Sequence, residues 1–201
     1  MTWQPGQDKI AGLLAAAELQ QVTADHRVAQ LLLDDAGRHL ATAAAASSSG
    51  DLSGAYLLAY DALRKSAASL LAEQGLRATS RGGHIAIQEA AQAQFGSTVR
   101  ALRSFGRIRR APNNFEYPGT TAPGPSPDDV SDAITTATQA RDAAVQILEQ
   151  NLLTPWRAPY KQDCSYSTHS ADYSRAGRGA VRPGAARRTT ASVTPDQTNQ
   201  E

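Results

Sequence analysis

Five arginines fall within the eleven residues from 100 to 110, and no acidic residue lies among them. Guanidinium groups offer paired, planar donors that match the oxygens of phosphate. A polar sequence, NNFEYP, follows at residues 113 to 118, and its amides and phenol are suited to contacts with a sugar or a base. The types and spacing of these residues indicate a site for a phosphate-bearing ligand.

The Arg-rich segment running into N-x-x-E-Y resembles the HEPN superfamily, a class of all-α proteins whose active members are metal-independent ribonucleases. The resemblance extends upstream to residues 55–78 and 81–90, which are similar to the second and third helices of actinobacterial HEPN proteins. In active members, the resemblance implies, an arginine, a polar residue just after it and a histidine a few residues on act on RNA. Two subunits then bring these motifs together across a dimer interface.

The sequence departs from this motif at two positions. Tyr117 stands where the histidine would be, and a phenol with an ordinary pKa of about 10 is a poor proton-transfer group near neutral pH. Pro112 stands where related proteins have their arginine, which leaves Arg110 as a candidate for that role. Proline also clashes with the carbonyl of Ile108 in a continuous helix, so we expect a kink or a break there.

Roles in such a site are predicted for the residues in and around this motif. The predicted catalytic residues are Arg109 and Arg110, which would bind phosphate, Asn113, which would position the sugar, and Glu116 and Tyr117, which would organise the site. Further phosphate contacts are predicted for Arg100, Arg103, Arg107 and His84. If RNA is cleaved, the expected product is a 2′,3′-cyclic phosphate formed without a metal ion.

Each of these residues also has a structural interpretation. The arginines can form a solvated helix face with salt bridges to neighbouring helices. Glu116 can pair with an arginine of another helix, and Tyr117 can be buried with its hydroxyl bonded. His84 is either a substitute acid–base group near the Arg-rich helix or a helix-end histidine bonded to backbone.

Three further polar side chains fall at core spacing. Tyr56 and Tyr60 are predicted to pack in the core. Arg141 lies near the apolar stripe of its helix, where a charge needs a partner, and Glu116 and Glu89 are the candidates.

Apolar periodicity predicts helices along most of the chain. They span residues 10–19, 25–46, a segment between Asp51 and Gly75, residues 81–95, an Arg-rich helix after residue 98, and residues 127–153. The expected N-caps are Asp51 or Ser53, Ser97 or Thr98, and Ser126, which precedes Pro127 at a first helical position. The expected inward residues include Val28, Leu32, Ala36, Leu40 and Ala43 in the second helix, His84 and Ile87 in the fourth, and Val130, Ile134 and Ala137 in the last.

These elements predict an all-α fold, an up-and-down bundle of four to five main helices over residues 8–154. Residues 155–201 are rich in Arg, Gly, Ser and Pro and are predicted to be a disordered basic tail. The tail has seven basic and four acidic residues, a net charge of +3. It is a phosphate-binding arm in one interpretation and a solvated extension in the other.

Composition excludes several other classes of protein. The net charge of +1 argues against strong non-specific nucleic-acid binding by the whole chain. No secretion signal or membrane span is evident, so a cytoplasmic location is expected. With a single cysteine, Cys164, and no metal-spaced His or Cys pairs, no cofactor or metal is predicted.

Three functions remain open. The first is an RNA-interacting HEPN-like protein, in its strongest form a metal-independent endoribonuclease of a toxin–antitoxin or stress-response system, acting as a homodimer. The second is a non-catalytic HEPN module that binds a partner protein, such as a nucleotidyltransferase or an antitoxin. The third is a purely structural helical dimer.

Overall fold

A computed structural model of the chain describes residues 5–110 and 124–158. In chain order its elements are α1 (Gln7–Ala15), β1 (Leu19–Gln21), α2 (His26–Ser48), α3 (Leu52–Glu73), β2 (Leu76–Ala78), α4 (Gly83–Phe95), the 3₁₀ helix η1 (Arg100–Ser104), α5 (Phe105–Arg110) and α6 (Pro127–Glu149). The predicted all-α fold is confirmed, with the addition of one two-stranded sheet.

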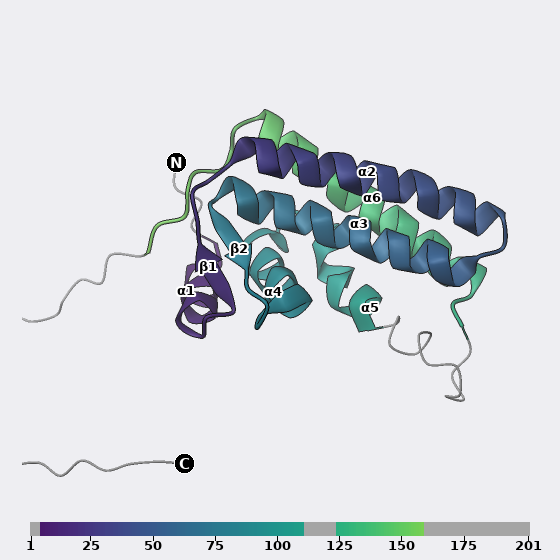
Figure 1. The fold of residues 1–201 in the computed structure, drawn as a ribbon, viewed down its shortest axis with the longest axis horizontal. Helices are drawn as coiled ribbons and strands as arrows, with labels where there is room; N and C mark the ends of the chain where they lie inside the picture. The colour runs from purple at the N-terminus through teal and green to yellow at the C-terminus, as the bar shows by residue number, and fades with distance from the viewer. Residues whose placement is uncertain (1–4, 111–123, 159–201) are drawn as a thin grey trace, which may run out of the picture. The chain divides into compact units, whose positions relative to one another are not determined.

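Three long helices, α2, α3 and α6, lie side by side and form the main layer (Figure 1). A turn of three residues, 49–51, joins α2 to α3, so these two helices run antiparallel, and α6 packs against both. The shorter helices α4 and α5 contact α3, while η1 contacts α4 and α6. The Arg-rich segment therefore lies next to three other helices.

Side-chain caps fix where the long helices begin. Asp25 caps α2 and Asp51 caps α3, and each carboxylate accepts a hydrogen bond from the amide three residues on, at 3.1 and 2.8 Å. Ser126 and Asp129 form a reciprocal capping box at the start of α6, and Pro127 occupies its first turn. The predicted caps Asp51 and Ser126 are confirmed, because an N-cap oxygen satisfies an amide that the helix leaves unpaired.

The core is built largely from alanine, which lets the helix backbones approach closely. Ala36, Ala59 and Ala137 are fully buried at the contacts of the three long helices. The largest fully buried side chains include Leu63, Phe95, Phe105 and Ile108. Burial of these few large side chains supplies most of the hydrophobic stabilisation, since an alanine removes little apolar area from water.

The predicted inward residues Ala36 and Ala43 of α2 are buried, but the buried face differs from the prediction in the first part of the helix. Ala29 and Leu33 are buried, whereas Val28 is 43 % exposed and Leu32 is half-buried. The prediction of Val28 as a core residue is wrong. Helix α2 packs against both α3 and α6, and these two contacts together decide which of its side chains are buried. Val28 and Leu32 instead line a groove described below.

The short antiparallel sheet was not predicted. β1 pairs with β2 in the register Leu19–Ala78 and Gln21–Leu76, and the helix predicted to run to Leu19 ends at Ala15. Three-residue strands carry too little alternation to be read from a sequence. Gly75, with φ of +72°, turns the chain from α3 into β2.

The chain after α6 returns to the sheet. The helix ends at Glu149 rather than near residue 153, and Trp156 is 7 % exposed although its sequence context suggested a tail. The amide of Trp156 donates to the carbonyl of Gln74 (2.8 Å), and the side chain of Gln21 donates to the carbonyl of Trp156 (2.9 Å). The body therefore includes Trp156, and the rest of the predicted tail from residue 159 lies outside the described residues.

Arg141 finds a different partner from those predicted. Its Nε donates to the carbonyl of Leu33 on α2 (3.1 Å). Glu89, one of the two predicted partners, pairs instead with Lys9 at 2.6 Å. Asp142, the next residue of α6, lies 3.7 Å from the same guanidinium, so a backbone carbonyl and a neighbouring carboxylate are its described partners.

Candidate functional site

The Arg-rich segment forms two short helices instead of the single capped helix that was predicted. η1 follows Val99, and no side chain caps it, so the predicted caps Ser97 and Thr98 are wrong. Leu102, Phe105 and Ile108 are fully buried. Residues three apart lie on the same face of a 3₁₀ helix. Burial of these side chains therefore favours a 3₁₀ helix, η1, at the start of the segment. The arginines are left on the outer side.

Two of these arginines are engaged within the chain. Arg103 donates from Nε to the carbonyl of Gly96 (2.6 Å), just after the end of α4. Arg107 forms an ion pair with Asp132 of α6, and this hydrogen-bonded partner raises the pKa of the Arg107 guanidinium. Both contacts hold the Arg-rich segment against its neighbours.

Arg109 points toward α4 and meets a neutral amide. Its Nε donates to Oε1 of Gln88 at 2.7 Å. Gln88 in turn donates to Gln92 (3.1 Å), which donates to the carbonyl of Leu102 (2.9 Å). This row of amides on α4 links the two short helices and fixes the direction of Arg109 without neutralising its charge.

Gly106 allows α5 to approach this row of amides. A Cβ at this position would lie 2.8 Å from Nε2 of Gln88, closer than carbon and nitrogen tolerate. The atom that it would meet is the far end of a flexible side chain. A larger residue here would displace Gln88, and with it Arg109, rather than prevent the helix from packing.

His84 opens α4 and contacts a tyrosine of α3. The hydroxyl of Tyr60 lies 2.8 Å from Nδ1 of His84, and the two rings are 5.8 Å apart between centroids. The other side of Tyr60 contacts the ring of Phe105 at 6.3 Å. Tyr60 therefore joins α4 to the Arg-rich segment, and the imidazole is exposed rather than on the predicted apolar face.

The electrostatics of this pair favour neutral forms. Burial raises the pKa of Tyr60, so its hydroxyl keeps its proton and can donate to Nδ1. Partial desolvation of the His84 ring, which is still exposed to solvent, lowers its pKa, and the nearby positive charges of Arg64 and Arg109 lower it further, against the opposing effect of Asp61. The lowered pKa favours the uncharged ring, and in the tautomer whose Nδ1 accepts from Tyr60 the proton lies on Nε2.

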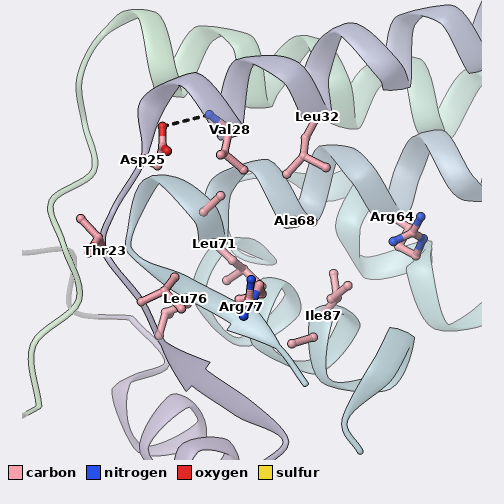
Figure 2. A pocket seen from close by; sticks show the side chains of 13 residues that line it. Thr23, Asp25, Val28, Leu32, Arg64, Ala68, Leu71, Leu76, Arg77 and Ile87 are labelled. Carbon is pink, nitrogen blue, oxygen red and sulfur yellow. Dashed lines mark hydrogen bonds between the residues drawn. The ribbon is translucent and has the colours of Figure 1, made fainter. Parts of the chain in front are cut away.

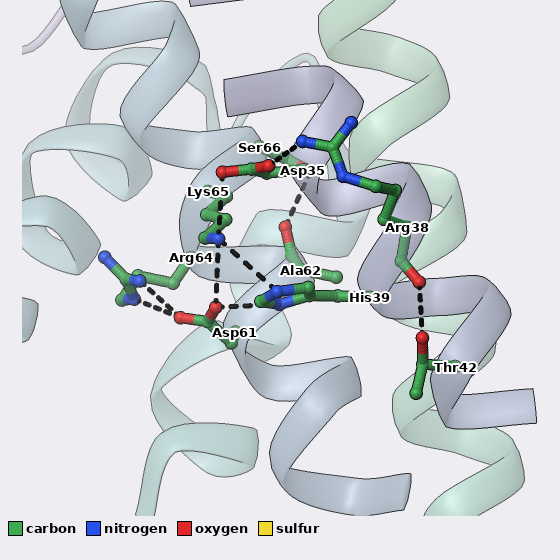
Figure 3. Close-up of polar contacts among 9 residues, drawn as sticks. All are labelled: Asp35, Arg38, His39, Thr42, Asp61, Ala62, Arg64, Lys65 and Ser66. Carbon is green, nitrogen blue, oxygen red and sulfur yellow. Dashed lines mark hydrogen bonds and ion pairs between the residues drawn. The ribbon is translucent and has the colours of Figure 1, made fainter. Parts of the chain in front are cut away.

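Arg64 is the second guanidinium of the site. It lies one helical turn from Tyr60 on α3, and its Nε donates to Oδ1 of Asp61 at 2.7 Å (Figure 3). The other oxygen of Asp61 lies 2.8 Å from Nδ1 of His39 on α2, close enough for an ion pair but not aligned as a hydrogen bond. Asp61 thereby orients Arg64 and also ties α3 to α2.

The same network continues along α2. Lys65 lies 3.2 Å from Asp35 and 3.5 Å from Asp61, and Arg38 pairs with Asp35 (Figure 3). Hydrogen bonds from Lys65 and Arg38 lower the pKa of Asp35. These ion pairs form a contact between α2 and α3.

The arrangement can bind an oxyanion. Arg109 and Arg64 both act on the charge of His84, but Arg64 is also ion-paired with Asp61, whereas the described partner of Arg109 is the neutral amide of Gln88. Nε2 of His84 is the ring nitrogen that the contact with Tyr60 leaves for a ligand. An imidazole with a lowered pKa becomes cationic when an anion binds beside it, because the anion stabilises the charged form. The site therefore combines phosphate-binding groups with one side chain that can exchange a proton.

The structure brings together some of the predicted site residues. Arg109 and His84 lie in one cluster, while Arg103 and Arg107 bond to other parts of the chain. Arg100 and Arg110 are exposed and form no ion pair within the part of the chain that the structure describes. The remaining predicted residues, Asn113, Glu116 and Tyr117, and the break expected at Pro112, lie outside the described residues.

Sequence reasoning missed three residues of this cluster. Gln88 and Arg64 were not singled out, and Tyr60 was assigned to the core. Helical spacing carries the signal in two cases, because Gln88 follows His84 by four residues and Arg64 follows Tyr60 by four. Nothing in the sequence indicates that α3 and α4 place these two pairs side by side.

Two kinds of feature are absent from residues 5–110 and 124–158. No group of three or more His, Cys, Asp or Glu side chains could hold a metal ion. None of the helices there has the length and apolar content needed to cross a membrane.

Comparison with known proteins gives a family but no individual relative. No curated protein matches the chain, and no solved structure matches it. A family model described as the HEPN domain matches residues 29–148, from the first turn of α2 to the last turn of α6. This match spans more than half of the chain and includes Tyr60, Arg64, His84 and Arg109, so the protein belongs to the HEPN domain family.

Proposed function

We propose that this HEPN protein interacts with RNA and holds a backbone phosphate at a site formed by Arg109, Arg64 and His84. The observation that carries the proposal is the orientation of Arg109. Its guanidinium is fixed by the neutral amide of Gln88 instead of a carboxylate, and it lies beside the titratable imidazole of His84. An arginine held in this way keeps its charge for an external anion.

In the stronger form of the proposal the protein is a metal-independent endoribonuclease. The 2′-hydroxyl oxygen would attack phosphorus, its proton would pass to a base, and the bond to the 5′-oxygen would break as that oxygen gains a proton. The products are a 2′,3′-cyclic phosphate and a 5′-hydroxyl. Arginine charges would stabilise the non-bridging oxygens, and His84 is the described side chain suited to exchange protons.

The wider biological role is also part of this proposal. We assign the RNA-interacting unit to residues 8–158, acting as a homodimer in a toxin–antitoxin or stress-response system. Asn113, Glu116 and Tyr117 keep their predicted roles in contacting the sugar and organising the site. The basic sequence after residue 158 is proposed as an accessory arm that adds non-specific attraction to phosphate.

The test is RNA binding and cleavage by the full-length protein in excess chelator. The variants are Arg109→Ala and, as a matched control, Arg38→Ala, which removes one positive charge from an exposed position on α2. The proposal predicts that Arg109→Ala weakens RNA binding while Arg38→Ala does not. Release of cyclic phosphate by the wild type and by Arg38→Ala, but not by Arg109→Ala, would establish the ribonuclease.

Two results would contradict the proposal at different levels. Binding without cleavage by the wild type would remove the enzymatic form and keep the RNA interaction. Equal binding by wild type and Arg109→Ala would remove the proposed phosphate site.

A second candidate is a non-catalytic module that binds a partner protein, such as a nucleotidyltransferase or an antitoxin. It is favoured by Val28 and Leu31, which are 43 % and 53 % exposed and lie three residues apart on one face of α2. Exposed apolar side chains of this size suit a protein contact. A partner whose binding survives Arg109→Ala and is lost in Leu31→Glu would support this function.

A further inference from the structure

A groove of about 630 Å³ lies between α2, α3, β2 and α4 (Figure 2). Its walls are mostly aliphatic and include Leu32, Ala68, Leu71 and Ile87. A few polar groups also line it, among them Thr23, Arg64 and Arg77. Ligand sites in proteins commonly have this volume and this mixture of apolar walls with a few polar groups.

The groove continues directly into the phosphate site. On α3, Tyr60, Arg64 and Ala68 follow one another at intervals of four residues and so lie on one face of the helix. Arg64 lines the groove, while Tyr60, one turn away, contacts His84. On α4, Ile87 lines the groove one turn after His84. Arg64 therefore marks the end of the groove and the edge of the site.

The shape and charge of this surface favour an anion joined to an apolar body. Arg64 and Arg77 are the positive groups that line the groove, and Arg64 is ion-paired with Asp61, which does not line it. The one carboxylate of the lining, that of Asp25, accepts a hydrogen bond from the amide of Val28. The chain's own C-terminal sequence, with its net charge of +3, does not complement these arginines. An external ligand with negative charge at one end fits better.

We propose that the groove receives an unstacked base of single-stranded RNA, next to the phosphate held by Arg109 and His84. This inference rests on the proposed function and names its substrate as unpaired RNA. The faces of a base are apolar and suit walls formed by Leu32, Ala68 and Ile87, while guanidinium planes such as those of Arg64 and Arg77 stack on bases. A base still paired in a duplex could not reach this position.

The experiment compares two fluorescently labelled probes by anisotropy with the full-length protein. One probe is a short oligouridine, and the other is a ribose-phosphate chain of the same length and charge without bases. The proposal predicts that the abasic chain binds at least about tenfold more weakly, as expected for the loss of one or more base contacts. A duplex RNA of equal length is expected to bind no better than the abasic chain.

A groove-filling variant tests the location. Ala68→Phe should abolish the preference for oligouridine while keeping the affinity for the abasic chain. Leu31→Phe adds the same kind of side chain at an exposed position outside the groove and should keep the preference. The wild-type comparison of the two probes remains decisive if Ala68→Phe lowers the helix content measured by circular dichroism.

The outcomes separate this inference from the proposed function. Equal binding of both probes by the wild type would overturn the base site and leave the phosphate site intact. A preference for oligouridine that persists in a folded Ala68→Phe variant would place the base contact outside this groove. Binding of neither probe would overturn both proposals.

Discussion

The hydroxyl of Tyr60, on α3, lies 2.8 Å from Nδ1 of His84, on α4. This contact joins a helix of the main layer to the helix that supports Arg109. It also leaves Nε2 of His84 as the nitrogen able to meet a ligand. The chemistry of the site therefore depends on charges that two helices, α3 and α5, bring to one imidazole on α4.

The pKa of His84 should report on Arg109. We expect Arg109→Gln to raise this pKa, because the positive charge of Arg109 now opposes protonation of the ring. Asp61→Asn should lower it, since the carboxylate favours the protonated form. The measurement is an NMR titration of the imidazole. Arg38→Gln, which is not among the charges that act on His84, is the control, and an unchanged pKa in Arg109→Gln would contradict the geometry.

Stability should fall on mild acidification because of His84. Its pKa is lower in the folded than in the unfolded protein, where it is about 6.5, so the unfolded state binds the proton more readily. The contribution is fully present above that value and is lost as the pH falls through the folded pKa. Urea unfolding below about pH 6.5 should show a smaller decrease in the free energy of unfolding for His84→Gln than for the wild type. Identical slopes would argue against this assignment.

Much of the fold follows from local signals in the sequence. Ser126, Pro127 and Asp129 predict the start of α6, and Asp51 predicts the start of α3, because a cap depends only on neighbouring residues. The break into η1 and α5 was not predicted, since it follows from burying Leu102 against other helices. Long-range packing of that kind leaves no local pattern.

The site was less predictable than the fold. His84 and Arg109 were identified by residue type, but their proximity results from the packing of α4 on α3 and α5. Gln88 has no charge and no motif, yet it sets the direction of Arg109. A row of amides becomes visible only when two helices are placed together.

Gly106→Ala should impair RNA binding without unfolding the protein. The new methyl group would displace Gln88, whose Nε2 lies 2.8 Å from the position of the Cβ, and would release Arg109. Alanine also favours the helical backbone over glycine by up to about 1 kcal/mol. Affinity for the oligouridine probe and the thermal midpoint are the two measurements. A lower midpoint with unchanged affinity would show that Gln88 does not position Arg109.

The salt dependence of RNA binding should identify the phosphate contact. We expect Arg109→Ala to reduce the slope of log K against log salt by about 1, the value for one phosphate contact. Arg38→Ala should leave the slope unchanged, because its guanidinium is paired with Asp35 on the outer side of α2. A slope that falls equally in both variants would indicate general charge attraction rather than a site.

Loss of the capping box at α6 should destabilise the fold. Ser126→Ala removes the oxygen that accepts from the amide of Asp129 and is expected to cost about 1 kcal/mol of unfolding free energy. Ser131→Ala, at an exposed position inside the same helix, is the matched control and should be neutral or slightly stabilising. Equal effects of the two substitutions in urea unfolding would contradict the role of the cap.

Trp156 determines where the protein can be shortened. Its backbone bonds to Gln74 and Gln21, and its ring is buried, so three elements distant in sequence meet at one residue after the last helix. A chain that ends at the last residue of α6 would contain the sequence of every described helix but would lack the contacts made by Trp156. Fusion partners, tags and truncations should therefore be placed after residue 158. An RNA-binding defect in a shorter chain would reflect the lost contacts of Trp156 with Gln74 and Gln21 rather than the missing tail.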